Sequence, residues 1–187
     1  DGEPPGGAWY QSAQSRLSMD SIEAQTAGVI DFCLGETTYG VSHQLMQAPT
    51  TALTAFGALC SGLIDYGYTD WHRDASSAEQ APLSGMQLDL MENAPGYVQW
   101  NIALYEDDVF WILPGSHKQG KVDIKQMVAD SGSERIEGAV PLLCGAGDVF
   151  ICNRQLVHGS FANSSPDRRI TLNAGFFPRS RVLDVTT

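Results

Sequence analysis

The sequence predicts a mainly β protein, an antiparallel sandwich or barrel with a few flanking helices. From about Thr51 onward, short apolar or alternating runs are separated by turn residues, which is typical of antiparallel sheets. The 19 glycines and 9 prolines supply frequent turns, and 43% hydrophobic with 18% charged residues is ordinary for a globular protein. At 187 residues the chain is long enough for one good core, so we expect a single domain over residues 1–187.

The elements follow from local signals along the chain. Residues 1–19 open with a Pro/Gly-rich stretch and are expected to be a loose lead. Asp20 with Glu23 three residues later predicts a helix N-terminus, and Gly35 predicts its end, so residues 21–34 form the expected helix. A second short helix is expected over residues 123–130. Runs of strand character occupy residues 85–91, 97–105, 110–113, 138–143, 148–152 and 168–177. The chain starts at Asp1 without a methionine, which leaves open that N-terminal elements are missing.

The charge balance argues against two classes of partner. Eleven basic residues stand against 22 acidic ones, and the net charge of −11 repels nucleic acid and anionic membrane surfaces. The longest mostly apolar stretches, residues 52–64 and 109–113, are shorter than the roughly 20 residues that a membrane-spanning helix needs. We therefore expect a small-molecule partner, and the sequence does not indicate an oligomeric state.

The four cysteines indicate the compartment. Cys33, Cys60, Cys144 and Cys152 match neither a paired zinc motif nor a dense disulfide framework. We interpret them as reduced core thiols, which fits a cytoplasmic protein.

A candidate metal site comes from three side chains. In a strand, His72 and Asp74 would lie on the same face, adjacent along the chain. His158 lies just beyond the apolar run at 148–152 and can supply a third ligand. Two imidazoles and one carboxylate on one face of a metal leave positions open, which suits iron(II) that must bind a cosubstrate and dioxygen. The alternative is a surface charge pair for His72 and Asp74 and a backbone-bonded loop histidine for His158.

Arg169 makes the catalytic interpretation more specific. On its strand it shares one face with Thr171, Asn173 and Gly175. An inward arginine is costly unless it meets an anion, and a dicarboxylate would supply one, with Ser160 or Thr171 adding a hydrogen bond. The alternative is an exposed edge-strand arginine, which is our interpretation of Arg168.

The motifs together resemble the phytanoyl-CoA dioxygenase family. The resemblance covers roughly residues 65–177. It rests on Trp71-His72-Arg73-Asp74, Leu113-Pro114-Gly115-Ser116-His117-Lys118, Gly147-Asp148-Val149-Phe150-Ile151 and His158-Gly159-Ser160 with Asn163 three residues later, followed by Arg169. It implies a double-stranded β-helix (jelly roll, cupin-like) with His72, Asp74 and His158 as iron ligands. It also implies that Arg169, helped by Ser160, holds 2-oxoglutarate.

The same resemblance implies the reaction. Such an enzyme uses Fe(II), 2-oxoglutarate and O2, and converts 2-oxoglutarate to succinate while it hydroxylates a C–H bond. Because Asp74 is present, hydroxylation is favoured over halogenation, for which relatives lack the carboxylate ligand. The chain also departs from the family, because Tyr105-Glu106-Asp107-Asp108 replaces a frequent Asn-Gly turn.

Strand alternation suggests a substrate pocket. Tyr68 and Asp70 would share the metal face of their strand, and Gln99 and Asn101 alternate against apolar neighbours. The alternative is that these polar residues face solvent. His117 is expected to be structural rather than a ligand.

Two rival functions remain open at this point. One is a cupin-like metalloenzyme that needs no 2-oxoglutarate, against which Arg169 argues, because such an enzyme has no dicarboxylate to anchor. The other is a non-catalytic jelly-roll binding module, against which the complete ligand set argues.

Overall fold

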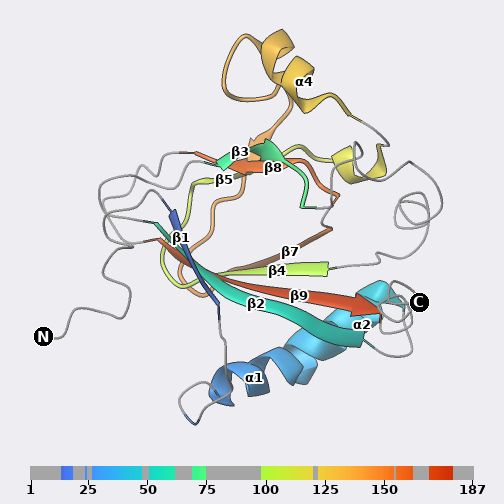
Figure 1. Ribbon diagram of the computed structural model, residues 1–187, viewed down its shortest axis with the longest axis vertical. Helices are drawn as coiled ribbons and strands as arrows, with labels where there is room; N and C mark the ends of the chain where they lie inside the picture. The colour runs from blue at the N-terminus through green and yellow to red at the C-terminus, as the bar shows by residue number, and fades with distance from the viewer. Residues whose placement is uncertain are drawn as a thin grey trace, which may run out of the picture.

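A computed structural model describes residues 14–18, 24, 27–47, 51–61, 69–74, 98–119, 122–153, 155–161 and 169–178. Two antiparallel sheets dominate it (Figure 1). The larger sheet has the order β1-β2-β9-β4-β7, with strands β1 (Gln14–Ser18), β2 (Thr51–Ser61), β9 (Ile170–Pro178), β4 (Val98–Ala103) and β7 (Val149–Asn153). The smaller sheet has the order β3-β8-β5-β6, with strands β3 (Thr69–His72), β8 (His158–Ser160), β5 (Phe110–Ile112) and β6 (Val140–Pro141). The mainly β jelly-roll prediction is confirmed.

Helices cover the outer sides of the two sheets. Helix α1 (Ala27–Leu34), the π-helical segment η2 (Glu36–Gly40) and helix α2 (Val41–Met46) lie along the larger sheet, and α4 (Ile124–Ser131) lies beyond the smaller one (Figure 1). None of the helices in the described part of the chain has the length and apolar character that a membrane crossing requires.

Hydrophobic packing occurs on these outer sides. Between the helices α1 and α2 and the larger sheet, the buried residues are Cys33, Met46, Val98, Trp100, Ala174 and Phe176. Hydrogen bonds also hold α2 against the larger sheet. Trp100 Nε1 donates to Ser42 Oγ at 2.8 Å, and Ser42 Oγ donates to the Thr38 backbone oxygen at 2.7 Å. Under α4 the buried residues are Trp71, Leu113, Ile136, Val157 and Phe161. Because apolar side chains take the outer faces, alternation directs the polar residues of several strands into the space between the sheets.

Most predicted elements lie where the sequence placed them. Strands β4, β5, β6, β7 and β9 fall within the predicted runs to within one residue, and α4 begins after Asp123, whose carboxylate accepts from the Gln126 N–H at 3.0 Å. The predicted strand at 85–91 lies outside the described residues.

Two predictions at the N-terminal end need correction. Residues 14–18, expected in the loose lead, form β1, because they pair antiparallel with the long strand β2. The first helix ends at Leu34 as predicted but begins at Ala27 in the described residues, and the predicted capping residues Asp20 and Glu23 lie outside them. Gly35 ends α1, but η2 and α2 follow it directly.

Candidate metal centre and its pocket

Strands β3 and β8 bring two histidines together. The two strands are antiparallel, and His72 is the pairing partner of His158. The imidazole ring centroids are 4.3 Å apart. His72 is half-buried, whereas His158 is 4% exposed and packs under the ring of Phe110, with centroids 5.1 Å apart and planes 24° from parallel.

Asp74 completes the cluster from beyond the end of β3. Its Oδ1 lies 3.3 Å from His72 Nε2, and its Oδ2 lies 3.7 Å from His158 Nε2. The ligand atoms of the three residues all lie within 4.8 Å of one another. Asp74 was predicted to share a strand face with His72, but β3 ends at His72 and Asp74 lies in a bend, so the bend rather than the pleat directs its carboxylate to the histidines.

Backbone carbonyls orient both imidazoles. Nδ1 of His72 lies 2.7 Å from the Asp70 oxygen, and Nδ1 of His158 lies 2.9 Å from the Leu156 oxygen. A carbonyl can only accept, so it favours a proton on Nδ1 and leaves the Nε2 lone pair directed at the cluster.

The electrostatics of the cluster favour deprotonated ligands. Burial works to raise the pKa of the Asp74 carboxyl. When the histidines are protonated, a hydrogen bond from His72 and the charges of both rings, together with a hydrogen bond from Gln99, hold this pKa below its ordinary value. Burial is also the main cause that lowers the pKa of His158. A carboxylate and a neutral imidazole are the forms that bind a metal ion.

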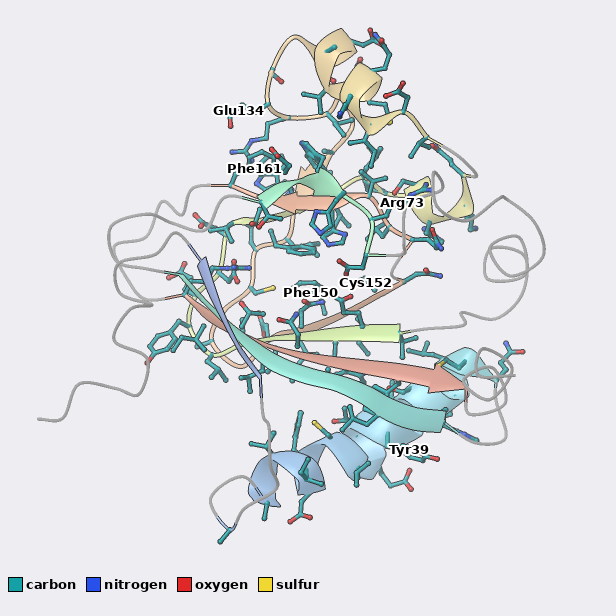
Figure 2. All side chains as sticks on the ribbon, in the orientation of Figure 1. Tyr39, Arg73, Glu134, Phe150, Cys152 and Phe161 are labelled. Atoms are coloured by element: carbon teal, nitrogen blue, oxygen red, sulfur yellow. The ribbon has the colours of Figure 1, made fainter. Side chains whose placement is uncertain are left out.

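A pocket opens beside these three residues. Figure 2 shows Phe150 and Cys152 directed into the space between the two sheets. Most of the residues that line the pocket have polar side chains, and the full set is Thr69, His72, Asp74, Gln99, Asn101, Phe110, His158, Gly159, Ser160, Arg169 and Asn173.

Arg169 lies in this pocket as predicted, but it already has an anionic partner. It is 2% exposed, and its Nε donates to Asp107 Oδ2 at 2.8 Å. Its Nη1 is buried and has no hydrogen-bond partner among the described residues. In the sequence, residues 105–108 stand out only as a departure from the family, and no local signal indicates that Asp107 pairs with Arg169.

Thr171 does not line the pocket, which corrects its predicted role. Its hydroxyl donates to Asp107 Oδ2 at 2.9 Å, so its single proton is already engaged. Ser160, the other predicted hydroxyl, is 4% exposed and does line the pocket.

The predicted substrate residues divide into three groups. Gln99 and Asn101 line the pocket on β4, and Asn173 on β9 donates from its amide to Asn101 Oδ1. Asp70 is exposed and does not line the pocket, because β3 bulges against β8 between Thr69 and His72 and directs Thr69 inward instead. Tyr68 and Arg168 lie outside the described residues.

His117 is not part of the cluster of candidate metal ligands. It lies in the short helix η3 (Ser116–Lys118) and is not among the pocket-lining residues. Burial, followed by the charges of Lys118 and Arg73, lowers its pKa.

The fold and the cluster together point to one class, the jelly-roll proteins in which two histidines and one carboxylate can hold a metal ion. Residues 61–171 match the phytanoyl-CoA dioxygenase (PhyH) family. Since this match spans more than half of the chain, the protein belongs to that family.

Solved structures support the fold. HygX from Streptomyces hygroscopicus, crystallised with nickel, 2-oxoglutarate and hygromycin B, is similar with a TM-score of 0.67 and 18% identity, over 89% of this chain and 70% of HygX. SnoN, a non-heme alpha-ketoglutarate-dependent epimerase from nogalamycin biosynthesis, has a TM-score of 0.59 and 18% identity, over 88% of this chain and 63% of SnoN. EvdMO1 has a TM-score of 0.52 and 24% identity, over 70% of this chain and only 28% of EvdMO1. A comparison with curated protein sequences finds no significant match.

Proposed function

We propose that this chain is an Fe(II)- and 2-oxoglutarate-dependent dioxygenase that hydroxylates a C–H bond of a small molecule. The observation that carries the proposal is the convergence of His72, Asp74 and His158 in a pocket that Arg169 also lines.

The three side chains suit iron(II). Two Nε2 atoms and one carboxylate leave further positions for small ligands, which is the arrangement that non-heme iron oxygenases use. The backbone carbonyls behind both imidazoles fix the tautomer that such binding requires.

The pocket suits 2-oxoglutarate through Arg169. A buried guanidinium nitrogen without an acceptor is costly, so an anion that reaches Nη1 would be stabilised there. Ser160 lines the same pocket and offers a hydroxyl. HygX and SnoN, whose names report 2-oxoglutarate or alpha-ketoglutarate, agree with this assignment.

Bound iron, 2-oxoglutarate and dioxygen would supply the oxidising chemistry, and the protein would supply orientation and exclusion of water. Phe110 packs on His158 and shields one side of the cluster. Gln99 supports Asp74 by a hydrogen bond, and the amides of Asn101 and Asn173 offer donors and acceptors to a polar substrate. The small-molecule assignment follows from the pocket and from the net charge of −11, which disfavours nucleic acid and anionic membranes.

The reaction outcome and the compartment are parts of the same proposal. We assign hydroxylation because Asp74 is present as a candidate ligand. SnoN, which is described as an epimerase, is an example of a different reaction on this fold. We assign the protein to the cytoplasm, in agreement with free thiols at Cys33, Cys144 and Cys152.

The test begins anaerobically. Iron(II) and then 2-oxoglutarate are added to metal-free protein, and the visible charge-transfer band of the chelate is recorded before oxygen is admitted and succinate is measured. We expect the band in the wild type and its loss in His72→Ala, Asp74→Ala and His158→Ala, with Ser133→Ala, an exposed serine, as the control. Full turnover by Asp74→Ala would contradict the metal assignment. Iron binding without the band would favour a cupin-like enzyme without 2-oxoglutarate, and no iron binding would favour a binding module.

A further inference from the structure

Asp107 does not line the pocket itself, and hydrogen bonds hold both its backbone and its carboxylate in place. Its backbone exchanges hydrogen bonds with Cys144, at 2.8 and 2.9 Å. Its Oδ1 accepts from the Val109 N–H at 3.1 Å, and its Oδ2 accepts from Arg169 Nε and Thr171 Oγ1. At 3% exposure this carboxylate cannot leave Arg169 without losing most of these bonds.

The Asp107 carboxylate changes the electrostatics of the arginine. Arg169 carries one positive charge, and the carboxylate at 2.8 Å compensates it inside a region where both side chains are under 5% exposed. The guanidinium keeps at least one donor without a partner among the described residues, the buried Nη1. The pair therefore presents a hydrogen-bond donor with little net charge, in contrast to an arginine without an acidic partner.

We propose that Asp107 is a specificity-determining residue, which limits how strongly this pocket prefers a 2-oxo acid with a charged far end. The inference rests on the proposed function, because it concerns the far end of the 2-oxo acid that Arg169 would hold. An uncharged carbonyl at that end can accept from Nη1, and a carboxylate gains less than usual because it also meets the negative charge of Asp107.

The test compares two probes that differ in charge and hardly in shape. These are 2-oxoglutarate and 2,5-dioxohexanoate, in which a methyl group replaces one oxygen of the far carboxylate. Both keep the 2-oxo acid end, so both can be titrated anaerobically into the iron(II)-loaded protein through the chelate band. In the wild type we expect the two dissociation constants to agree within about tenfold, or about 1.4 kcal/mol.

The decisive variant is Asp107→Asn, which removes the charge and keeps a carbonyl for Arg169 and Thr171. We expect it to bind 2-oxoglutarate at least tenfold more tightly and to bind 2,5-dioxohexanoate with unchanged affinity. The matched control is Asp108→Asn, which removes the same charge from the neighbouring, half-buried residue and should leave the ratio of the two constants as in the wild type.

The outcomes separate the inference from the proposed function. Equal weakening of both probes by Asp107→Asn would overturn the inference, because Asp107 would then only hold Arg169 in place. If this variant does not fold, the ratio of the two dissociation constants in the wild type is the test. A wild type that binds 2-oxoglutarate more than about tenfold more tightly than 2,5-dioxohexanoate overturns the inference. If the iron-loaded wild type binds neither probe, the proposed function fails and the inference fails with it.

Discussion

Arg73 donates from Nη2 to the backbone oxygen of Ser116 at 2.7 Å, and this bond connects the metal centre to the Pro-Gly-Ser-His turn. Arg73 lies between the candidate ligands His72 and Asp74, and it also bonds the Gln119 oxygen at 3.1 Å. Figure 2 shows Arg73 beside the short helix of this turn. The Ser116 side chain in turn accepts from the Val157 N–H, the residue before His158, at 2.8 Å. One buried serine therefore holds both ligand-bearing segments.

We expect Ser116→Ala to weaken metal binding. Loss of Oγ leaves the buried Val157 N–H without its acceptor, which costs about 1–3 kcal/mol of unfolding free energy. The backbone at Val157, directly before His158, should then shift. We expect metal affinity to fall by about tenfold or more, as it does when other groups that support metal ligands are removed. Titration of cobalt(II) and urea unfolding measure the two effects, with Ser133→Ala as the exposed control. Unchanged cobalt affinity would show that the turn does not position His158.

The sequence predicted the strands better than it predicted how the site is assembled. Polar and apolar residues alternate in β4 and β9, whereas β5 and β7 were predicted from short apolar runs between turn residues. Alternation failed at β3, where a bulge directs Thr69 into the pocket and Asp70 toward solvent. A bulge depends on the partner strand, which local periodicity does not reveal.

Arg169 shows the same limit of local sequence patterns. The strand pattern predicted a buried Arg169 that needs an anion, and the arginine is buried. The anion that the structure supplies is Asp107, 62 residues away in the chain, in a short bridge with Cys144 whose neighbouring acidic residues could equally have faced solvent. Pairing over such a distance follows from the packing of β9 against β4, not from a local motif.

Gly159 has room for a side chain only if the neighbouring strand β3 moves slightly. A Cβ there would lie 3.1 Å from the Thr69 oxygen and 3.4 Å from the Trp71 nitrogen, both backbone atoms of the bulged strand β3. Gly159→Ala should therefore push β3 away from β8, lower the unfolding free energy by about 1–3 kcal/mol and weaken metal binding through His72. Gly28→Ala is the control, because nothing lies within 4 Å of its Cβ in α1 and alanine favours a helix. Metal affinity equal to the wild type in Gly159→Ala would refute the prediction.

The Arg169–Asp107 pair should show strong coupling in stability. Arg169→Met leaves the Asp107 carboxylate buried without its cation, and we expect a loss of about 3–5 kcal/mol. Adding Asp107→Asn removes the stranded charge, so the double variant should be more stable than Arg169→Met alone. Urea unfolding of the metal-free proteins completes the double-mutant cycle. Additive losses would mean that the pair is not coupled.

Cys152 should be unreactive as long as the protein is folded. Burial, aided by the nearby charge of Asp74, raises the pKa of its thiol to about 12, while the hydrogen bond from Asn101 opposes this only in part. Because the thiolate is the nucleophile, its fraction at pH 8 falls roughly a thousandfold below that of an ordinary cysteine. Brief iodoacetamide labelling at pH 8 followed by peptide mass spectrometry should therefore find Cys152 unmodified in the native protein and modified in urea. Rapid native labelling would mean that the space between the sheets opens to reagent, in conflict with the packing of Cys152 beside Asn101.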